Sequence, residues 1–440
     1  MDLGGLMNSK NPMFRMLSLR DFRLLFAGTT VSLLGDQFTL IATPWLTLQL
    51  TGDPMALGLV LALEGIPRAA IMLFGGAITD RFSPRIVMFT ADIIRFLLTF
   101  LMAFAVFTGA VQIWMMYIFS LGFGFMSGFE IPAESSIVPT LVKKHELQAG
   151  NSLMLSAAQV AQFVGPTVAG ILIGQYSHSF LGIGLAYALD ALGFATSATC
   201  LWLMSRGNKH QHSEDAPEKD SIITAVLAGV KYLRTDNALM LIILVIAGLN
   251  FSLIGPLMVG IPVLANQRLP EGAMAFGLLM SAYAGGSLAG FLMAGSLPRP
   301  SGKAMGVILI SFMIACGVVI ASLAFIQSTW IDFALMFPLG MGNGYISIIL
   351  FSWVQIRTPN EMLGRMMSIV SFSSYGLMPI SQAISGAVIK WSPDALFLLA
   401  GLLVLMLTLW TACQPALKTF SESLVAQENS YGSSGGIKEP

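Results

Sequence analysis

Charged residues are scarce in this chain of 440 amino acids: 10% are Asp, Glu, Lys or Arg, and 55% are hydrophobic. A soluble globular domain usually carries about 25% charged residues, so a water-exposed globule is excluded. The 23 basic and 23 acidic residues give a net charge of zero, which indicates no particular partner, and no nucleic-acid partner is expected. The composition therefore indicates a chain that lies in a lipid bilayer.

Cysteine and histidine are also rare, with three and four residues respectively. Cys200, Cys316 and Cys413 have no paired spacing of the kind found in disulfide frameworks or metal sites, and they fall in or beside apolar runs as packing residues. His210 and His212 have no nearby cysteine, so a solvated linker is favoured over a metal site. We expect neither a metal nor another cofactor.

Long hydrophobic runs, in contrast, are abundant. Each is roughly 20 residues long, which is enough for a helix to cross about 30 Å of hydrocarbon. The sequence predicts an all-α polytopic membrane protein with twelve transmembrane helices. The expected spans are 24–48, 56–79, 86–108, 111–132, 152–175, 180–204, 238–265, 273–296, 303–325, 330–354, 366–389 and 395–414.

The second half of the chain repeats features of the first. Residues 38–41 (Phe-Thr-Leu-Ile) return as residues 251–254 (Phe-Ser-Leu-Ile), and residues 55–59 (Met-Ala-Leu-Gly-Leu) return as residues 274–278 (Met-Ala-Phe-Gly-Leu). Two parallel halves of about six spans, related by an axis along the membrane normal, are typical of one large class of secondary transporter. The sequence thus predicts two six-helix bundles.

A polar stretch from Ser205 to Asp220 separates the halves and has too little apolar content to fold alone. Apolar residues then recur at helical spacing up to Leu233, as in a helix that lies on a membrane surface. The expected division is a cytoplasmic N-terminal segment at 1–21, an N-terminal bundle at 22–204, a cytoplasmic linker with an amphipathic helix at 205–237, a C-terminal bundle at 238–414 and a disordered cytoplasmic tail at 415–440.

The distribution of Lys and Arg predicts the orientation, because basic loops are kept in the cytoplasm. If twelve spans alternate, only Arg268 and Lys390 fall on the side opposite to the other loop cations. We therefore expect both termini to be cytoplasmic. The predicted location is a multi-pass position in a bacterial-type plasma membrane.

The strongest local motif, GGAITDRFSPR at residues 75–85, lies between the second and third spans. Gly76 permits close helix approach, Asp80 can sit at the positive N-terminus of a neighbouring helix, and Arg81 and Arg85 can pair with acids or lipid phosphates. The motif resembles the loop signature of the major facilitator superfamily, with Ser-Pro where Gly-Arg is common.

This resemblance implies a cytoplasmic latch that holds the inner gate shut in an outward-open state. The implied partners are Glu130 in the fourth span and the start of the eleventh span around Gly364 and Arg365. The phrases around Asp36, Asp92, Pro132 and Gly364 resemble, in their order and spacing, the branch with macrolide efflux proteins and the enterobactin exporter.

A second motif, Gly165-Pro166 with Gly170, lies in the fifth span. Proline removes one backbone hydrogen bond and kinks a helix, while glycines let a neighbouring helix pack closely. The motif is similar to the one that exporters of the superfamily carry in this span, which implies antiport. A kinked packing helix without bearing on transport direction is the equally weighted alternative.

Charges inside spans are costly and are normally kept for a pathway, a proton relay or a buried pair. The clear cases all lie in the N-terminal half: Asp36, Glu64, Arg68, Asp92, Arg95 and Asp190. We expect proton coupling here and a pliable substrate wall in the Met-rich C-terminal half. Asp36, with no in-register cation on its own span, is the first candidate for the titrating acid.

The other intramembrane charges allow more than one interpretation. Glu64 and Arg68 are four residues apart, and a static ion pair explains them at least as well as a proton relay does. For Asp92 and Arg95 we favour an ion pair that braces the gate. Asp190 either has a functional role or is a polar group that hydrogen-bonds to neighbouring helices, and the sequence does not choose between the two.

We therefore expect a monomeric, proton-coupled exporter of amphipathic drugs or metabolites, with membrane lipid around it and no enzymatic activity. Siderophore export, uptake and phospholipid transport remain alternatives on the same fold. A membrane enzyme or receptor is disfavoured, because the histidines fall outside the spans and no catalytic constellation is present in the sequence.

Overall fold

The computed structural model describes residues 12–81, 83–143, 146–177, 179–205, 229–297, 302–417 and 420. The side chains of residues 12–14, 73–81, 302–303 and 360–361 also lie outside this description. Within these ranges the chain is helical and contains no strand. Ten of the helices are long and apolar enough to cross a membrane.

A short helix, α2 (Pro12–Ser18), precedes the first group of six long helices. Its Arg15 pairs with Glu146 at 3.1 Å, which attaches this helix to the start of the fifth span. The first group consists of α3 (Arg20–Thr51), α4 (Pro54–Arg81), α5 (Pro84–Phe107), α6 (Ile113–Leu141), α7 (Leu147–Gln175) and α8 (Leu181–Leu203). We call it the N-bundle.

The second group, which we call the C-bundle, is built in the same way except for its fifth span. That span is divided into two α-helices joined by a π-helical turn. The group consists of α10 (Asn237–Gln267), α11 (Ala273–Ser296), α12 (Gly302–Ser322), α13 (Thr329–Arg357), α14 (Asn360–Ser371) with η2 (Phe372–Gly376) and α15 (Met378–Ile389), and α16 (Pro393–Cys413). The prediction of an all-α protein with twelve transmembrane helices is confirmed.

The break in the eleventh span is a difference from the single helix expected at 366–389. Pro379 has no backbone N–H, so the regular hydrogen-bond ladder cannot continue unchanged through the start of α15. Just before this point the chain forms the π-helical turn η2, which is comparable to the π-bulges found within other α-helices.

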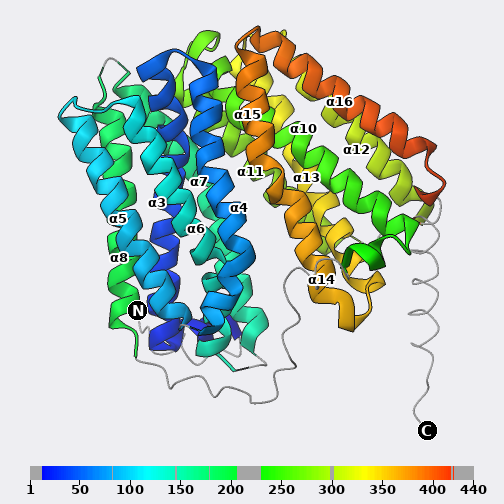
Figure 1. Cartoon of the computed structure of the whole chain (residues 1–440), viewed down its shortest axis with the longest axis horizontal. Helices are drawn as coiled ribbons and strands as arrows, with labels where there is room; N and C mark the ends of the chain where they lie inside the picture. Colours follow the sequence, from blue (N-terminus) through cyan, green and yellow to red (C-terminus); the bar gives the residue numbers. More distant parts are fainter. Residues whose placement is uncertain are drawn as a thin grey trace, which may run out of the picture.

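The two bundles meet at one end of the molecule, which we call the closed end. It is the end at which α3 stops and α4 begins, at the top of Figure 1. At the opposite, splayed end the ribbons of α4 and α6 stand apart from those of α13 and α14 (Figure 1). Between described residues of the two bundles, Gln49 donates a hydrogen bond to Asn266 (3.1 Å) and the backbone N–H of Thr167 donates one to Ser281 (3.0 Å). Lys390 forms an ion pair with Asp53 (3.8 Å).

Glycines make the closest approach between the bundles possible. Gly58 of α4 packs on Gly386 of α15, and Gly277 of α11 packs on Gly170 of α7. Gly58 and Gly277 are the equivalent glycines of the internal sequence repeat. The duplicated Met-Ala-x-Gly-Leu sequence therefore marks the two symmetry-related seams between the bundles.

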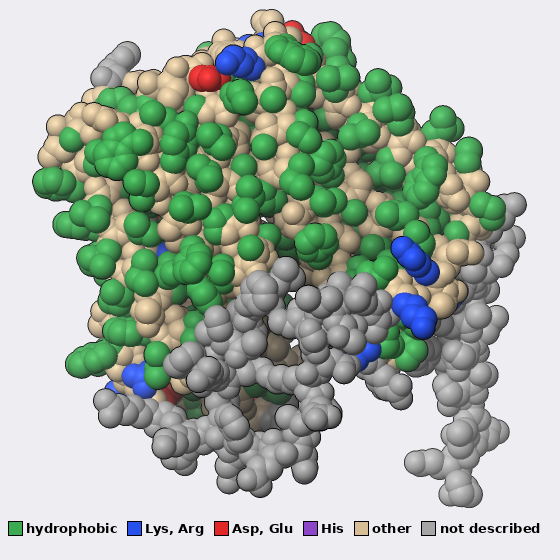
Figure 2. Space-filling view, viewed as in Figure 1, with side chains coloured by type: hydrophobic (Ala, Val, Ile, Leu, Met, Phe, Trp, Pro, Cys, Tyr) green, Lys and Arg blue, Asp and Glu red, His purple; other side chains and the backbone are tan. Residues whose placement is uncertain are grey.

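The outer surface has the character of a lipid-facing protein. Figure 2 shows apolar side chains over most of the visible face and few charged ones. Exposed tryptophans lie near both ends of the bundle: Trp391 (85% exposed) and Trp330 (63%) towards the closed end, and Trp202 (68%) and Trp410 (40%) towards the splayed end. Such aromatic belts mark the two membrane–water interfaces.

Candidate functional site

Arg95 of α5 is the centre of a charge network inside the N-bundle. Its side chain is 4% exposed, and the guanidinium lies 4.4 Å from the ring centroids of both Phe123 and Phe194. Its Nη2 donates to Asp36 of α3 at 3.1 Å, and its Nη1 donates to Glu130 of α6. One buried cation is thus shared between two carboxylates from two other helices.

This geometry adds one ion pair that the sequence did not show and corrects another that it suggested. Asp36 does have a cation, which comes from another span and so was not visible in the sequence around it. Arg95 forms ion pairs with Asp36 and Glu130 among the described residues and not with Asp92, although Asp92 is three residues away on the same helix. Glu130, expected as a partner of the gate motif, pairs with Arg95, and a contact with Asp80 or Arg81 stays a prediction because their side chains lie outside the described residues.

Asp92 and Asp190 lie in the buried wall of the same network. Asp92 is 1% exposed and faces Ser197 of α8, but neither of its carboxylate oxygens is in hydrogen-bond geometry with another group. Asp190 of α8 is fully buried and accepts a hydrogen bond from Thr39 of α3. The small Gly35 makes room for this carboxylate between the two helices.

Glu64 and Arg68 of α4 form a second ion pair in the N-bundle, with 3.2 Å between Oε1 and Nη1. Their side chains are 23% and 28% exposed, which is much more than Arg95. Arg68 is also close enough to interact electrostatically with Asp36. The pair therefore borders the network rather than standing apart from it.

Glu134 is a member of the network that the sequence analysis missed. It lies one helical turn after Glu130 on α6 and interacts electrostatically with Glu130, Asp36 and Arg95. The expected fourth span ends at residue 132, whereas α6 continues to Leu141, so Glu134 was assigned to a loop. The spacing of Glu130 and Glu134, four residues apart like Glu64 and Arg68, was the available signal.

The network has an excess of acid. Among the described residues, its carboxylates outnumber its guanidinium groups six to two: Asp36, Glu64, Asp92, Glu130, Glu134 and Asp190 against Arg68 and Arg95. A low-dielectric interior disfavours such an imbalance, so binding of protons or another cation to these acids would be favourable. The arrangement can therefore take up and release positive charge.

The C-bundle is not free of buried charge, contrary to expectation. Asp332, one turn into α13, is fully buried, and neither carboxylate oxygen has a hydrogen-bond partner among the described residues. Thr329, one turn earlier, donates to Glu271 at the closed end. Within the described part of the C-bundle, no arginine network like that of Arg95 surrounds Asp332.

The structure tests only part of the gate motif, because the side chains of Gly76, Asp80 and Arg81 lie outside the described residues. Arg85 caps the end of α8 within the N-bundle, since it donates to the backbone oxygens of Leu201 (2.6 Å), Trp202 (2.8 Å) and Ser205 (3.1 Å). A cation at a helix C-terminus is favourable in this position.

Two other members of the expected gate lie at the start of the eleventh span. Gly364 of α14 has open space where a side chain would be, and Arg365 lies beside Gly229 and Met362 in the C-bundle.

The Gly165-Pro166 motif lies where α7 meets other helices. Gly165 packs against Gln37 of α3, and the backbone oxygen of Pro166 lies against Gly277 of α11. With Gly170, the motif therefore forms part of the seam between the bundles. This contact accounts for the small residues, and it leaves the direction of transport untested.

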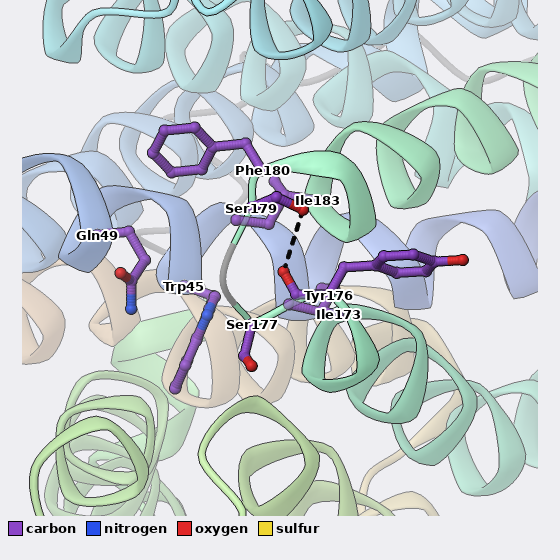
Figure 3. Close-up of a pocket in the computed structure, with 8 residues that line it drawn as sticks. All are labelled: Trp45, Gln49, Ile173, Tyr176, Ser177, Ser179, Phe180 and Ile183. Atoms are coloured by element: carbon purple, nitrogen blue, oxygen red, sulfur yellow. Dashed lines mark hydrogen bonds between the residues drawn. The ribbon is translucent and has the colours of Figure 1, made fainter.

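A separate pocket of about 200 Å³ opens at the closed end of the N-bundle. Figure 3 shows the indole of Trp45 beside Ser177, with Gln49 on the same helix. No charged side chain lines it, so it has none of the groups of the charge network. The lining residues are Trp45, Gln49, Ile173, Tyr176, Ser177, Ser179, Phe180 and Ile183.

Residues 25–383 match the family profile of the Major Facilitator Superfamily. The chain belongs to the Major Facilitator Superfamily. This superfamily member is 21% identical to macrolide efflux protein A of Streptococcus pyogenes over 88% of its own length and 94% of the relative. It is 22% identical to the multidrug efflux pump Tap of Mycolicibacterium fortuitum, over 82% and 87% of the two chains.

Solved structures give the same fold. A bacterial homologue of the human lysosomal transporter Spinster, in an inward-facing and occupied conformation, has a TM-score of 0.67 at 13% identity, covering 95% of this chain and 99% of the other. A POT family transporter in complex with 5-aminolevulinic acid has a TM-score of 0.66 at 15% identity, covering 93% and 96%. These identities are too low to transfer a ligand.

Proposed function

We propose that this superfamily member is a proton-coupled exporter, an antiporter that moves amphipathic drugs or metabolites out of the cell by alternating access. The observation that carries the proposal is the sharing of one buried arginine, Arg95, between Asp36 and Glu130. The efflux functions of the Streptococcus and Mycolicibacterium relatives support the outward direction.

Arg95 couples protonation to structure in this proposal. A proton on Asp36 or Glu130 removes one of the two charges that hold the guanidinium, so Arg95 then pairs with the other carboxylate alone. Because Asp36, Arg95 and Glu130 belong to three different helices, this change alters the forces between α3, α5 and α6. Asp36, 27% exposed, is the member through which a proton enters.

The position of the loop cations gives the proposed orientation. Basic residues such as Arg20, Arg23, Arg85 and Arg357 lie towards the splayed end, whereas Arg268 and Lys390 lie at the closed end. By the positive-inside rule the splayed end and both termini are then cytoplasmic. The state described here is accordingly inward-facing, and export requires the closed end to open.

The C-bundle contributes a substrate wall rather than the coupling charges. Its methionines and the π-helical turn at η2 suit a surface that adapts to different molecules. The chain acts as a monomer in a bacterial plasma membrane, surrounded by lipid. The latch around Asp80 and Arg81 holds the splayed end together in the outward-facing state.

The test is substrate-driven proton movement in proteoliposomes that contain a pH-sensitive dye. We expect proton flux on addition of macrolides or other amphipathic compounds, and its loss in Asp36→Asn. Asp394→Asn, a carboxylate of the C-bundle that pairs with Arg268 at the surface, is the matched control and should keep the flux. Equal flux in wild type and Asp36→Asn would refute this role, and a folded protein without flux for any compound would refute proton-coupled export.

A further inference from the structure

A row of hydroxyl groups leads from Asp190 towards the closed end of the N-bundle. Threonines occupy every fourth position at the end of α3, so they lie along one side of the helix and cover about 18 Å of its axis. We call Thr39, Thr43, Thr47 and Thr51 the hydroxyl row. The first three are 7%, 3% and 0% exposed, so the row runs through the interior of the bundle.

Two members of the row bond to side chains of α8. Thr39 donates to Oδ2 of Asp190, and the hydroxyl of Thr43 lies 2.9 Å from that of Tyr187, one turn before Asp190. Tyr187 and Asp190 are both 0% exposed. A threonine that only packs can satisfy its hydroxyl on its own helix, as Thr47 does with the backbone oxygen of Thr43. The two contacts with α8 therefore connect the row to a carboxylate.

Asp190 can in turn connect the row to the charge network. Its Oδ1 has no hydrogen-bond partner among the described residues and lies against Gly35, the residue before Asp36. A carboxyl group becomes a hydrogen-bond donor once it is protonated. Asp190 can therefore accept a proton on the side of Thr39 and donate one on the side of Asp36.

The charged groups around Asp190 belong to the same network. Asp36 of α3, Arg95 of α5 and Glu130 of α6 interact electrostatically with it, and Asp36 has the largest effect of the three. α7, which also packs on α8, carries no charged residue within Leu147–Gln175. Asp36 is accordingly the group to which Asp190 passes a proton most directly.

We propose that the hydroxyl row carries protons from the closed end to the charge network and that Asp190 is the acceptor at its end. When the closed end opens, water reaches Thr51 and a hydronium ion gives a proton to the row. Each hydroxyl takes up one proton and gives its own to the next group, with water between the hydroxyls that bond to backbone oxygens. Asp190 binds the arriving proton and passes it to Asp36, so the net change is one proton moved from the closed end to Asp36.

The inference deepens the proposed export function and rests on it for the direction of proton movement, but the row can be tested without transport. The experiment is hydrogen–deuterium exchange of the Asp190 carboxyl proton in the full-length protein in detergent. The infrared C=O absorption of the protonated acid at low pH reports the exchange, and its loss in Asp190→Asn assigns it. The starting protein is Asp36→Asn, which closes the route through the network and leaves the row.

Thr43→Val and Tyr187→Phe each remove one hydroxyl at nearly constant shape, and each should slow this exchange by about tenfold or more. The amplitude of the Asp190 absorption should stay the same, because the row affects the rate of proton transfer and not the final protonation. The matched control is Thr199→Val. Thr199 is an exposed threonine of α8 that donates to the backbone oxygen of Ala195 at 2.7 Å, so its removal should leave the exchange rate unchanged.

Equal exchange rates with and without the hydroxyls of Thr43 and Tyr187, or no Asp190 absorption at any pH, would overturn the inference. In proteoliposomes, the two single variants should slow substrate-driven proton flux and make it more sensitive to heavy water, and wild-type flux in both would also overturn it. Slowed exchange in a protein that shows no proton flux would support the row and refute only proton-coupled export.

Discussion

At the scale of single residues, the central feature is the contrast between Arg95 and its neighbours. A guanidinium that is 4% exposed and packed between two aromatic rings is stable only with its counter-ions. The two carboxylates that it holds are more exposed, at 27% for Asp36 and 17% for Glu130. The guanidinium is therefore buried, and the two carboxylates around it are more accessible.

Arg95→Gln should abolish proton-coupled transport and destabilise the N-bundle. It leaves Asp36 and Glu130 without their cation, and breaking a buried ion pair by removing one partner costs about 3–5 kcal/mol. The thermal unfolding temperature in detergent and dye-reported proton flux measure the two effects. Arg85→Gln is a useful comparison, since its guanidinium caps α8 instead; equal proton coupling in wild type and Arg95→Gln would contradict the prediction.

Asp236 gives a residue-scale prediction outside the membrane. Partial burial tends to raise its pKa, but the hydrogen bond from Arg357 (2.6 Å), the backbone N–H groups of Leu239 and Ala238 and the charge of Arg357 together hold the pKa of Asp236 below its usual value. A lowered native pKa stabilises the fold above the unfolded pKa, which is about 4, and this contribution is lost as the pH falls through the native value.

Asp236→Asn should therefore be less stable than wild type at pH 7, and the difference should shrink as the pH falls below about 4. Chemical unfolding of both proteins in detergent, at pH values from neutral to acid, measures this difference. A stability gap that stays constant down to acid pH would show that the carboxylate charge is not what stabilises the start of α10.

At the scale of helices, the glycine seams decide how closely the bundles approach. α7 meets α11 through Gly170 and Gly277, and α4 meets α15 through Gly58 and Gly386. In each seam one glycine belongs to the sequence repeat. Small residues at such contacts let helix backbones touch, as in other membrane helix pairs.

Gly277→Ala should weaken the closed end, because the added methyl group would meet the backbone oxygen of Pro166, which cannot move without displacing α7. Overpacking of this kind typically costs about 1–3 kcal/mol. Spin labels at the exposed Tyr176 and Trp391 report the separation of the bundles at this end, and we expect a larger population of long distances. Gly295→Ala on the same helix has open space around it and should behave as wild type.

At the scale of the whole molecule, the bundles are joined at one end and apart at the other. Among the described residues, the polar contacts that join them are the hydrogen bonds of Gln49 with Asn266 and of Thr167 with Ser281 and the exposed ion pair of Asp53 with Lys390. Each such contact contributes little, so the polar contacts add only a small cost to opening the closed end. This is the property that alternating access requires.

Locking the closed end should stop transport. Cysteines at Gln49 and Asn266, in a variant without the three native cysteines, should cross-link and eliminate flux, with recovery after reduction. The same pair of cysteines without cross-linking is the control. Undiminished transport in the cross-linked protein would show that this end does not open during the cycle.

Much of this architecture could be predicted from the sequence. Hydrophobic length defined the helices, because a lipid core leaves few alternatives to a helix of about 20 apolar residues. The Glu64–Arg68 ion pair was readable from its four-residue spacing. The least accurate limit was the end of α6, where Pro132 and Glu134 indicated a loop although the helix continues to Leu141.

By itself the sequence determined the number of spans, the repeat and the placement of most intramembrane charges, because these depend on local composition and periodicity. Only the tertiary structure decided that Arg95 pairs with Asp36 and Glu130 rather than with Asp92, that Arg85 caps α8, and that Glu134 lies near these charges. Residues from different helices become neighbours through packing, and ion pairing depends on that distance rather than on separation along the chain.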